Sequence, residues 1–61
     1  MKDKETERSE IVLRRILHGR REVLIEYLTM KTDEQDWHAV ADAAMDLREL
    51  DARLEALNGD D

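Results

Sequence analysis

The feature that most limits the fold is a run of apolar residues spaced three and four positions apart towards the C-terminal end of the sequence. The run consists of Val40, Ala43, Leu47, Leu50, Leu54 and Leu57. This spacing is the a/d pattern of a helix that packs along a partner helix, whereas a strand would alternate with a period of two. No proline interrupts the chain. We therefore expect an α-helix over about residues 33–57.

Both ends of this helix carry recognisable signals. The segment Thr32-Asp33-Glu34-Gln35 has the form of a capping box, in which the threonine side chain accepts a hydrogen bond from a backbone amide of the first turn. Asp33 is the alternative N-cap residue. Asn58-Gly59 is typical of a helix C-terminus. We expect the few residues after it, about 59–61, to form a frayed tail.

A second helix is expected over about residues 7–30, where apolar residues cover nearly half of the helix circumference at 100° per residue. They are Val12, Leu13, Ile16, Leu17, Val23, Leu24, Tyr27, Leu28 and Met30. The connection around residues 29–32 is short, so the two helices should be antiparallel neighbours of similar length. The predicted fold is all-α: one antiparallel helical hairpin domain over residues 1–61, with a frayed tail at about 1–6.

A single hairpin cannot bury so broad an apolar arc, because the second helix covers only one line of it. A chain of 61 residues is close to the lower limit for one stable core, and without cysteine it has no disulfides. We therefore expect a homo-oligomer, most simply a dimeric four-helix bundle. Ile11, His18 and Ile25 form a second stripe that leaves room for a larger assembly. The residues expected at core or oligomer contacts are Leu13, Leu17, Leu24, Tyr27, Trp37, Val40, Leu47, Leu50 and Leu54, with Tyr27 and Trp37 stacked across the turn.

The net charge of −6 is unevenly distributed. Residues 1–31 carry eight Lys or Arg and six Asp or Glu, a balance of +2, whereas residues 32–61 carry two Arg and ten Asp or Glu, a balance of −8. A chain this acidic is not expected to bind nucleic acid. No apolar run exceeds three residues and the N-terminal segment is strongly polar, so neither a membrane span nor an export signal is expected. A cytoplasmic location is the default expectation.

Arg20 is the most unusual residue, because it falls at the centre of the apolar arc. An unpaired charge is costly there, so the simpler interpretation is an ion pair with Asp51, which interrupts the seam of the second helix. An arginine that extends to the edge of the bundle is also compatible. The functional alternative is a guanidinium that lines a cleft between protomers and binds a phosphate or carboxylate.

The basic residues around Arg20 form the densest cluster of positive charge in the chain. The candidate anion-binding or partner-binding residues are Arg14, Arg15, His18, Arg20 and Arg21. Such a cluster suits bidentate contacts to a small phosphorylated ligand. It spans more than half of the helix circumference, however, so ordinary pairing with Glu22, Glu26 and the acidic second helix is an equally good explanation.

Catalytic signals are weak. The helix expected over about residues 33–57 carries one line of ionisable residues with i, i+4 spacing: Glu34, His38, Asp42 and Asp46. This line lies opposite the apolar a/d seam of the helix, where a solvated face is the simpler interpretation. The sequence contains no nucleophile–base pair, phosphate loop or nucleotide-binding fingerprint. We expect no catalytic residues, no metal and no cofactor.

Residues 36–57, DWHAVADAAMDLRELDARLEAL, resemble a segment found in short bacteriophage accessory proteins. The shared pattern is Asp, aromatic, His, any residue, Val, any residue, Asp-Ala-Ala, then Asp-Leu/Ile-Arg-Glu, and it covers Asp36 to Glu49 here. The resemblance implies a phage protein that acts in the host cytoplasm, where such proteins bind host proteins or sequester small signals.

Two hypotheses follow. The first is a non-enzymatic helical protein that binds or inhibits a host factor. The alternative is an oligomeric binder of a small anion or nucleotide signal, which would use the arginine cluster between protomers.

Overall fold

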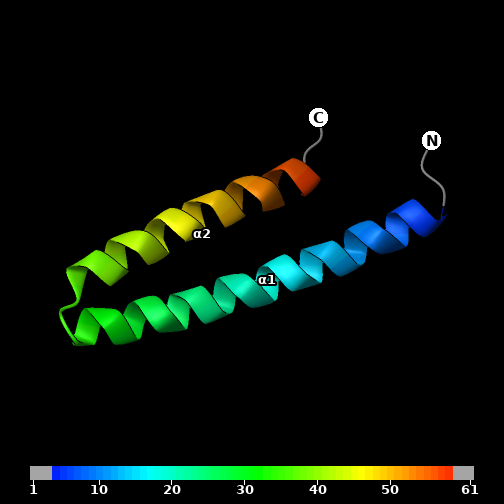
Figure 1. The fold of residues 1–61 in the computed structure, drawn as a ribbon. Coiled ribbons are helices and arrows are strands. Elements are labelled where there is room, and N and C mark those ends of the chain that lie inside the picture. The colour runs from blue at the N-terminus through cyan, green and yellow to red at the C-terminus, as the bar shows by residue number, and fades with distance from the viewer. Residues whose placement is uncertain (1–3, 59–61) are drawn as a thin grey trace.

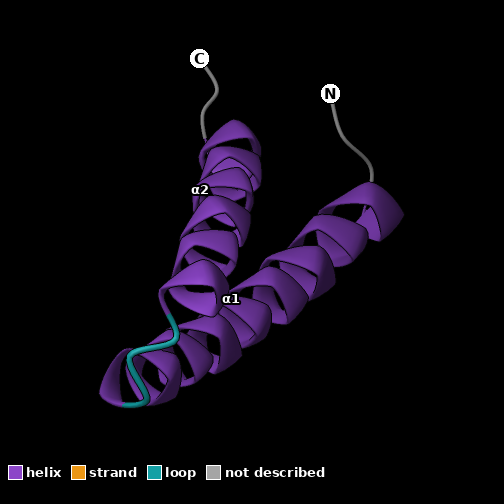
Figure 2. Cartoon of the chain, turned by 60° about the vertical axis from the view of Figure 1, so that its left-hand side comes forward, coloured by secondary structure: helices purple, strands orange, loops and turns teal. Residues whose placement is uncertain are grey.

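The computed structural model describes residues 4–58, and two α-helices make up nearly all of this range. Helix α1 spans Lys4–Asp33 and helix α2 spans Trp37–Asn58. The two helices run antiparallel and are joined by a loop at residues 34–36 (Figures 1 and 2). The predicted all-α hairpin is therefore confirmed. Residues 4–6 are helical, whereas the rest of the two expected tails, with the expected capping glycine at position 59, lies outside the described residues.

The two helices differ in length, contrary to the expectation of equal partners. With 30 and 22 residues, they are about 45 and 33 Å long at a rise of 1.5 Å per residue. The N-terminal part of α1 therefore extends beyond the end of α2 (Figure 1). The hairpin measures 48 × 19 × 10 Å and has a radius of gyration of 14.6 Å, against about 10.5 Å for a globular domain of this size. So thin a molecule can enclose only a small core.

The turn explains most of the difference in length, because α1 continues into the expected capping box and ends at Asp33. Thr32 is a residue of α1, and its hydroxyl donates to the Leu28 carbonyl oxygen at 2.7 Å. The helix then closes with Gln35 in the left-handed region at φ 60°. The Gln35 amide donates to the Thr32 carbonyl and the Asp36 amide to the Lys31 carbonyl, both at 3.0 Å. These two bonds form a Schellman motif at the end of α1.

Asp36 is the N-cap of α2. Its Oδ1 accepts a hydrogen bond from the Ala39 amide at 3.2 Å, and its carbonyl accepts the first helical bond, from Val40, at 3.0 Å. The predicted cap at Thr32, with Asp33 as its alternative, is therefore wrong. Both residues lie inside α1, whereas Asp36 stands immediately before the first helical residue of α2, where a capping carboxylate can reach the free amides.

The predicted seam of α2 is confirmed. All six of its residues are buried or half-buried, and Ala43, Leu50 and Leu54 are 2%, 5% and 6% exposed. In α1 the buried and half-buried residues form one line with 4–3 spacing, which we call the contact line: Glu10, Arg14, Leu17, Arg21, Leu24, Leu28 and Lys31. Leu17, 4% exposed, packs with Leu50 and Leu54 to form the core, and Leu24 and Leu57 pack against it.

The line that faces α2 runs along one edge of the apolar arc of α1 rather than through its centre. Four of the seven residues in this line are charged, so the hairpin buries little apolar surface. Leu13 and Tyr27, expected at core or oligomer contacts, are 43% and 40% exposed in the hairpin. The expected stacking of Tyr27 on Trp37 is wrong. Trp37 is 61% exposed and lies about 120° around α2 from the seam, while the Tyr27 ring lies against the Lys31 ammonium, 5.5 Å away.

Within residues 4–58, neither helix combines the length and the hydropathy that a membrane span requires.

Candidate functional site

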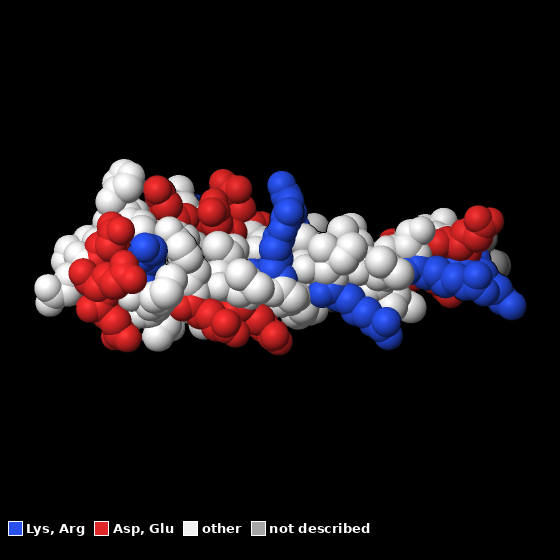
Figure 3. Space-filling view, turned by 60° about the horizontal axis from the view of Figure 1, so that its bottom comes forward, with Lys and Arg blue, Asp and Glu red and all other residues white. Residues whose placement is uncertain are grey.

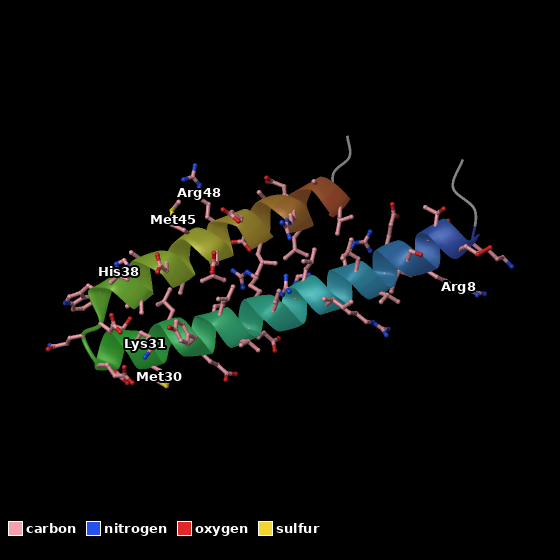
Figure 4. The ribbon with its side chains drawn as sticks, in the orientation of Figure 1. Arg8, Met30, Lys31, His38, Met45 and Arg48 are labelled. Carbon is pink, nitrogen blue, oxygen red and sulfur yellow. The ribbon has the colours of Figure 1, made fainter. Side chains whose placement is uncertain are left out.

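One surface of the hairpin is a line of exposed apolar side chains on α1, which we call the α1 stripe. Its members are Val12, Leu13, Ile16, Val23, Tyr27 and Met30, and each is between 40% and 65% exposed. Part of this stripe repeats the 4–3–4 spacing of the contact line two residues further along the chain, at Val12, Ile16, Gly19 and Val23. A step of two residues places it about 160° around the helix from the contact line. Met30 points away from α2 (Figure 4). The α1 stripe is thus a second packing line that the described residues leave largely exposed.

A groove of about 400 Å³ lies between the helices beside the α1 stripe. Its lining residues are Arg20, Val23, Leu24, Asp46, Glu49, Leu50 and Arg53. The groove therefore has an apolar floor and a rim with two arginines and two carboxylates, which sum to no net charge. A second shallow hollow of about 400 Å³ lies on the N-terminal half of α1, against Arg8, Ser9, Val12, Leu13 and Ile16.

The predicted ion pair between Arg20 and Asp51 is wrong. The Asp51 carboxylate instead accepts from the Arg21 Nε at 2.7 Å. The reason is that α2 packs on one edge of the apolar arc, along the contact line. Arg21 belongs to this line and reaches Asp51, whereas Arg20 lies outside the line and faces the groove. Arg20 is exposed, and it makes no ion pair with any of the described residues. The two side chains of the Arg21–Asp51 pair are 41% and 53% exposed, so solvent screening keeps their contribution small.

The five candidate anion-binding residues do not converge within one hairpin. Arg14 and Arg21 lie half-buried in the contact line, and the Arg14 Nε is buried without a hydrogen-bond acceptor among the described residues. Arg15 and His18 are exposed on other sides of α1, and Arg20 lines the groove. A small phosphorylated ligand would therefore meet only one or two of these cations on a single hairpin.

The remaining charged contacts lie near the turn and on the outer face of α2. The Lys31 ammonium donates to Glu34 at 3.1 Å, and this bond with the neighbouring negative charge raises the pKa of Lys31 above its ordinary 10.5. The His38 Nε2 lies 3.5 Å from Asp42. Residues 4–58 contain no group of three His, Cys, Asp or Glu side chains placed to hold a metal ion.

Sequence reasoning missed the groove and the separation of the α1 stripe from the contact line. The signal was present, because α1 contains two overlapping lines with 4–3 spacing. One is largely charged and the other largely apolar. The separation was missed because the leucines of the contact line and the residues of the α1 stripe were counted together as one broad apolar arc.

Comparison of the chain with protein-family models, with curated proteins and with solved structures gives no match, so its function has to be inferred from its own surfaces.

Proposed function

We propose that this chain is a non-enzymatic helical binding protein that works as a homo-oligomer, and that its copies associate through the α1 stripe. The observation that supports this is the α1 stripe itself, six apolar side chains that remain 40–65% exposed. Single exposed apolar residues are ordinary on soluble proteins, but a continuous line of them is typical of an interaction surface. Their helical spacing suits a second helix as the partner.

The surface area supports an assembly of this kind. The accessible surface of the chain is 5037 Å², whereas a compact monomer of its mass, 7.2 kDa, would expose about 4,100 Å². A standard protein interface removes about 800 Å² from each partner. Covering the α1 stripe would thus bring the exposed area of each chain close to that of a compact protein. The simplest assembly of two hairpins that does so is a dimeric four-helix bundle.

In this proposal the host factor contacts the surface that the bundle leaves outside. The resemblance of residues 36–57 to phage accessory proteins supports a host protein in the cytoplasm as the target. The alternative, a sponge for a small anion, receives less support from the groove. Asp46 and Glu49 share the groove with Arg20 and Arg53, so an anion would meet as much negative charge as positive there.

Sedimentation of the purified chain at micromolar concentrations tests the docking surface. The wild-type protein should sediment as a dimer or larger species, and Val23→Asp should shift it towards the monomer, because a carboxylate would be desolvated in the interface. The matched control is Met45→Asp. Met45 is 55% exposed and points away from α1 (Figure 4), so this change should leave the assembly intact.

A folded wild-type monomer at these concentrations would contradict the assembly. Thermal unfolding in the presence of nucleotides and inorganic phosphate tests the alternative. Stabilisation by several degrees, lost in Arg20→Met, would favour the anion-binding function instead.

A further inference from the structure

We infer that the occupant of the α1 stripe is the α1 stripe of a second copy of this chain, in the antiparallel orientation. This inference rests on the proposed function and specifies its partner and geometry. The observation that supports it is the order of charged residues beside the α1 stripe.

One flank of the α1 stripe carries four exposed charged residues in a segregated order. Arg8, Arg15 and Glu22 are seven residues apart, so they share one side of α1, and Glu26 follows four residues later on the same side. The order along the helix is therefore two positive charges followed by two negative charges. Figure 3 shows the same trend: acidic groups gather towards the turn and most of the Lys and Arg lie towards the start of α1, where some acidic groups are also present.

These four charges are not used inside the hairpin. All four side chains are exposed, and none makes an ion pair with another described residue. The ion pairs Arg21–Asp51 and Lys31–Glu34 do not involve these four residues. The ordered charges beside the stripe are thus available to a partner.

Antiparallel packing of two α1 helices places the positive end of this flank against the negative end of the same flank in the partner. When two identical helices pack antiparallel around a two-fold axis, the same flank of each helix faces the other with its direction reversed. Arg8 and Arg15 of one copy then lie along Glu22 and Glu26 of the other, and symmetry forms each contact twice. Parallel packing would instead place this flank against the opposite edge of the partner's α1 stripe, where Leu13 and Tyr27 are uncharged and the one charged residue between them is Arg20. Arg8 and Arg15 would then meet no acidic partner along this edge.

The centre of the α1 stripe also suits a close approach. Gly19 lies between Ile16 and Val23 in the 4–3–4 line, and a methyl group added there would meet nothing within 4 Å. The hairpin therefore has no steric need for glycine at this position. A second helix that crosses near Gly19 can place an apolar side chain over it.

Single thiols test the orientation directly, because the chain has no cysteine of its own. Ser9→Cys and Met30→Cys place a spin label near either end of the stripe, at exposed positions. In an antiparallel dimer each singly labelled variant should give a label separation of roughly 30 Å, from a rise of 1.5 Å per residue. An equimolar mixture of the two variants should give a second population in close contact, and oxidation of the unlabelled mixture should form the mixed disulfide.

A charge exchange provides the second measurement. Arg15→Glu should weaken dimerisation roughly tenfold at low ionic strength, and the effect should shrink with added salt. Glu22→Arg in the same chain should restore most of the affinity. The matched control is Arg48→Glu, an equal change of charge at a side chain that points away from α1 (Figure 4) and should leave dimerisation unchanged.

The outcomes separate the two proposals. A dimer that is broken by Val23→Asp but shows short separations between Ser9→Cys labels would be parallel, which would overturn this inference and leave the proposed function standing. A chain that stays monomeric would overturn both. A loss of dimerisation in Arg15→Glu that Glu22→Arg does not restore would also contradict the inference.

Discussion

Replacing Gln35 by glycine should stabilise the hairpin. Gln35 adopts φ 60°, a left-handed conformation in which the Cβ atom of an L-residue is crowded by the backbone, at a cost of about 1–2 kcal/mol. Glycine removes this crowding. It also gives the unfolded chain more freedom, which costs about 0.4–1 kcal/mol. The difference favours the variant by about 0.5–1 kcal/mol.

Thermal unfolding followed by far-UV circular dichroism measures this gain. For a domain of this size, 1 kcal/mol corresponds to about 4–8 °C, so the midpoint of Gln35→Gly should rise by roughly 2–8 °C. The concentration must be equal for all variants, because self-association makes the midpoint depend on it. Gln35→Ala is the control: it removes the same exposed side chain but keeps the Cβ atom, so it should show no comparable gain.

A Gln35→Gly variant that is no more stable than Gln35→Ala would refute the reasoning. It would mean that residue 35 is not held at positive φ in solution. The Schellman motif, and with it the end of α1 after Asp33, would then be incorrectly placed.

Three further changes test the packing, the cap and the ion pair. Leu50→Ala should lower the free energy of unfolding by about 2–5 kcal/mol in chemical denaturation, because Leu50 is 5% exposed. Met45→Ala on the outer face of α2 should lower it little, and equal losses in the two variants would disprove the seam. Asp36→Ala should cost about 1 kcal/mol through the lost cap of α2, and a larger loss in Thr32→Ala would place the start of α2 earlier. Arg21→Met should cost less than about 1 kcal/mol, because its ion pair is partly exposed; a loss of several kcal/mol would indicate a pair buried in the assembly.

The sequence by itself determined the existence of both helices and the packing face of α2. The helix over Trp37–Asn58 has one apolar line, so only one face could meet a partner, and its six residues are buried or half-buried as predicted. The antiparallel order follows from the short connection. Each of these conclusions depends only on local sequence, either the spacing of apolar residues within one helix or the length of the connection.

The end of α1 could not be settled in the same way, because two residues near the turn are suitable N-caps. Thr32 and Asp36 both have side-chain oxygens that can accept a backbone amide. The choice depends on where the preceding helix stops, and that is decided by the left-handed conformation of Gln35. A glutamine gives no local signal of such a turn, since glycine and asparagine are the usual residues there.

Only the tertiary structure decided which edge of α1 faces α2. Two lines with 4–3 spacing lie on different sides of this helix, and the apolar content of the arc between them favours its centre, at Arg20. The turn instead directs α2 onto the line that contains Leu17, Arg21 and Leu24. This places Arg21 beside Asp51 and leaves Val23 exposed. Spacing within one helix defines both faces, but the position of the second helix, set by the turn and by the packing of leucines across the interface, selects between them.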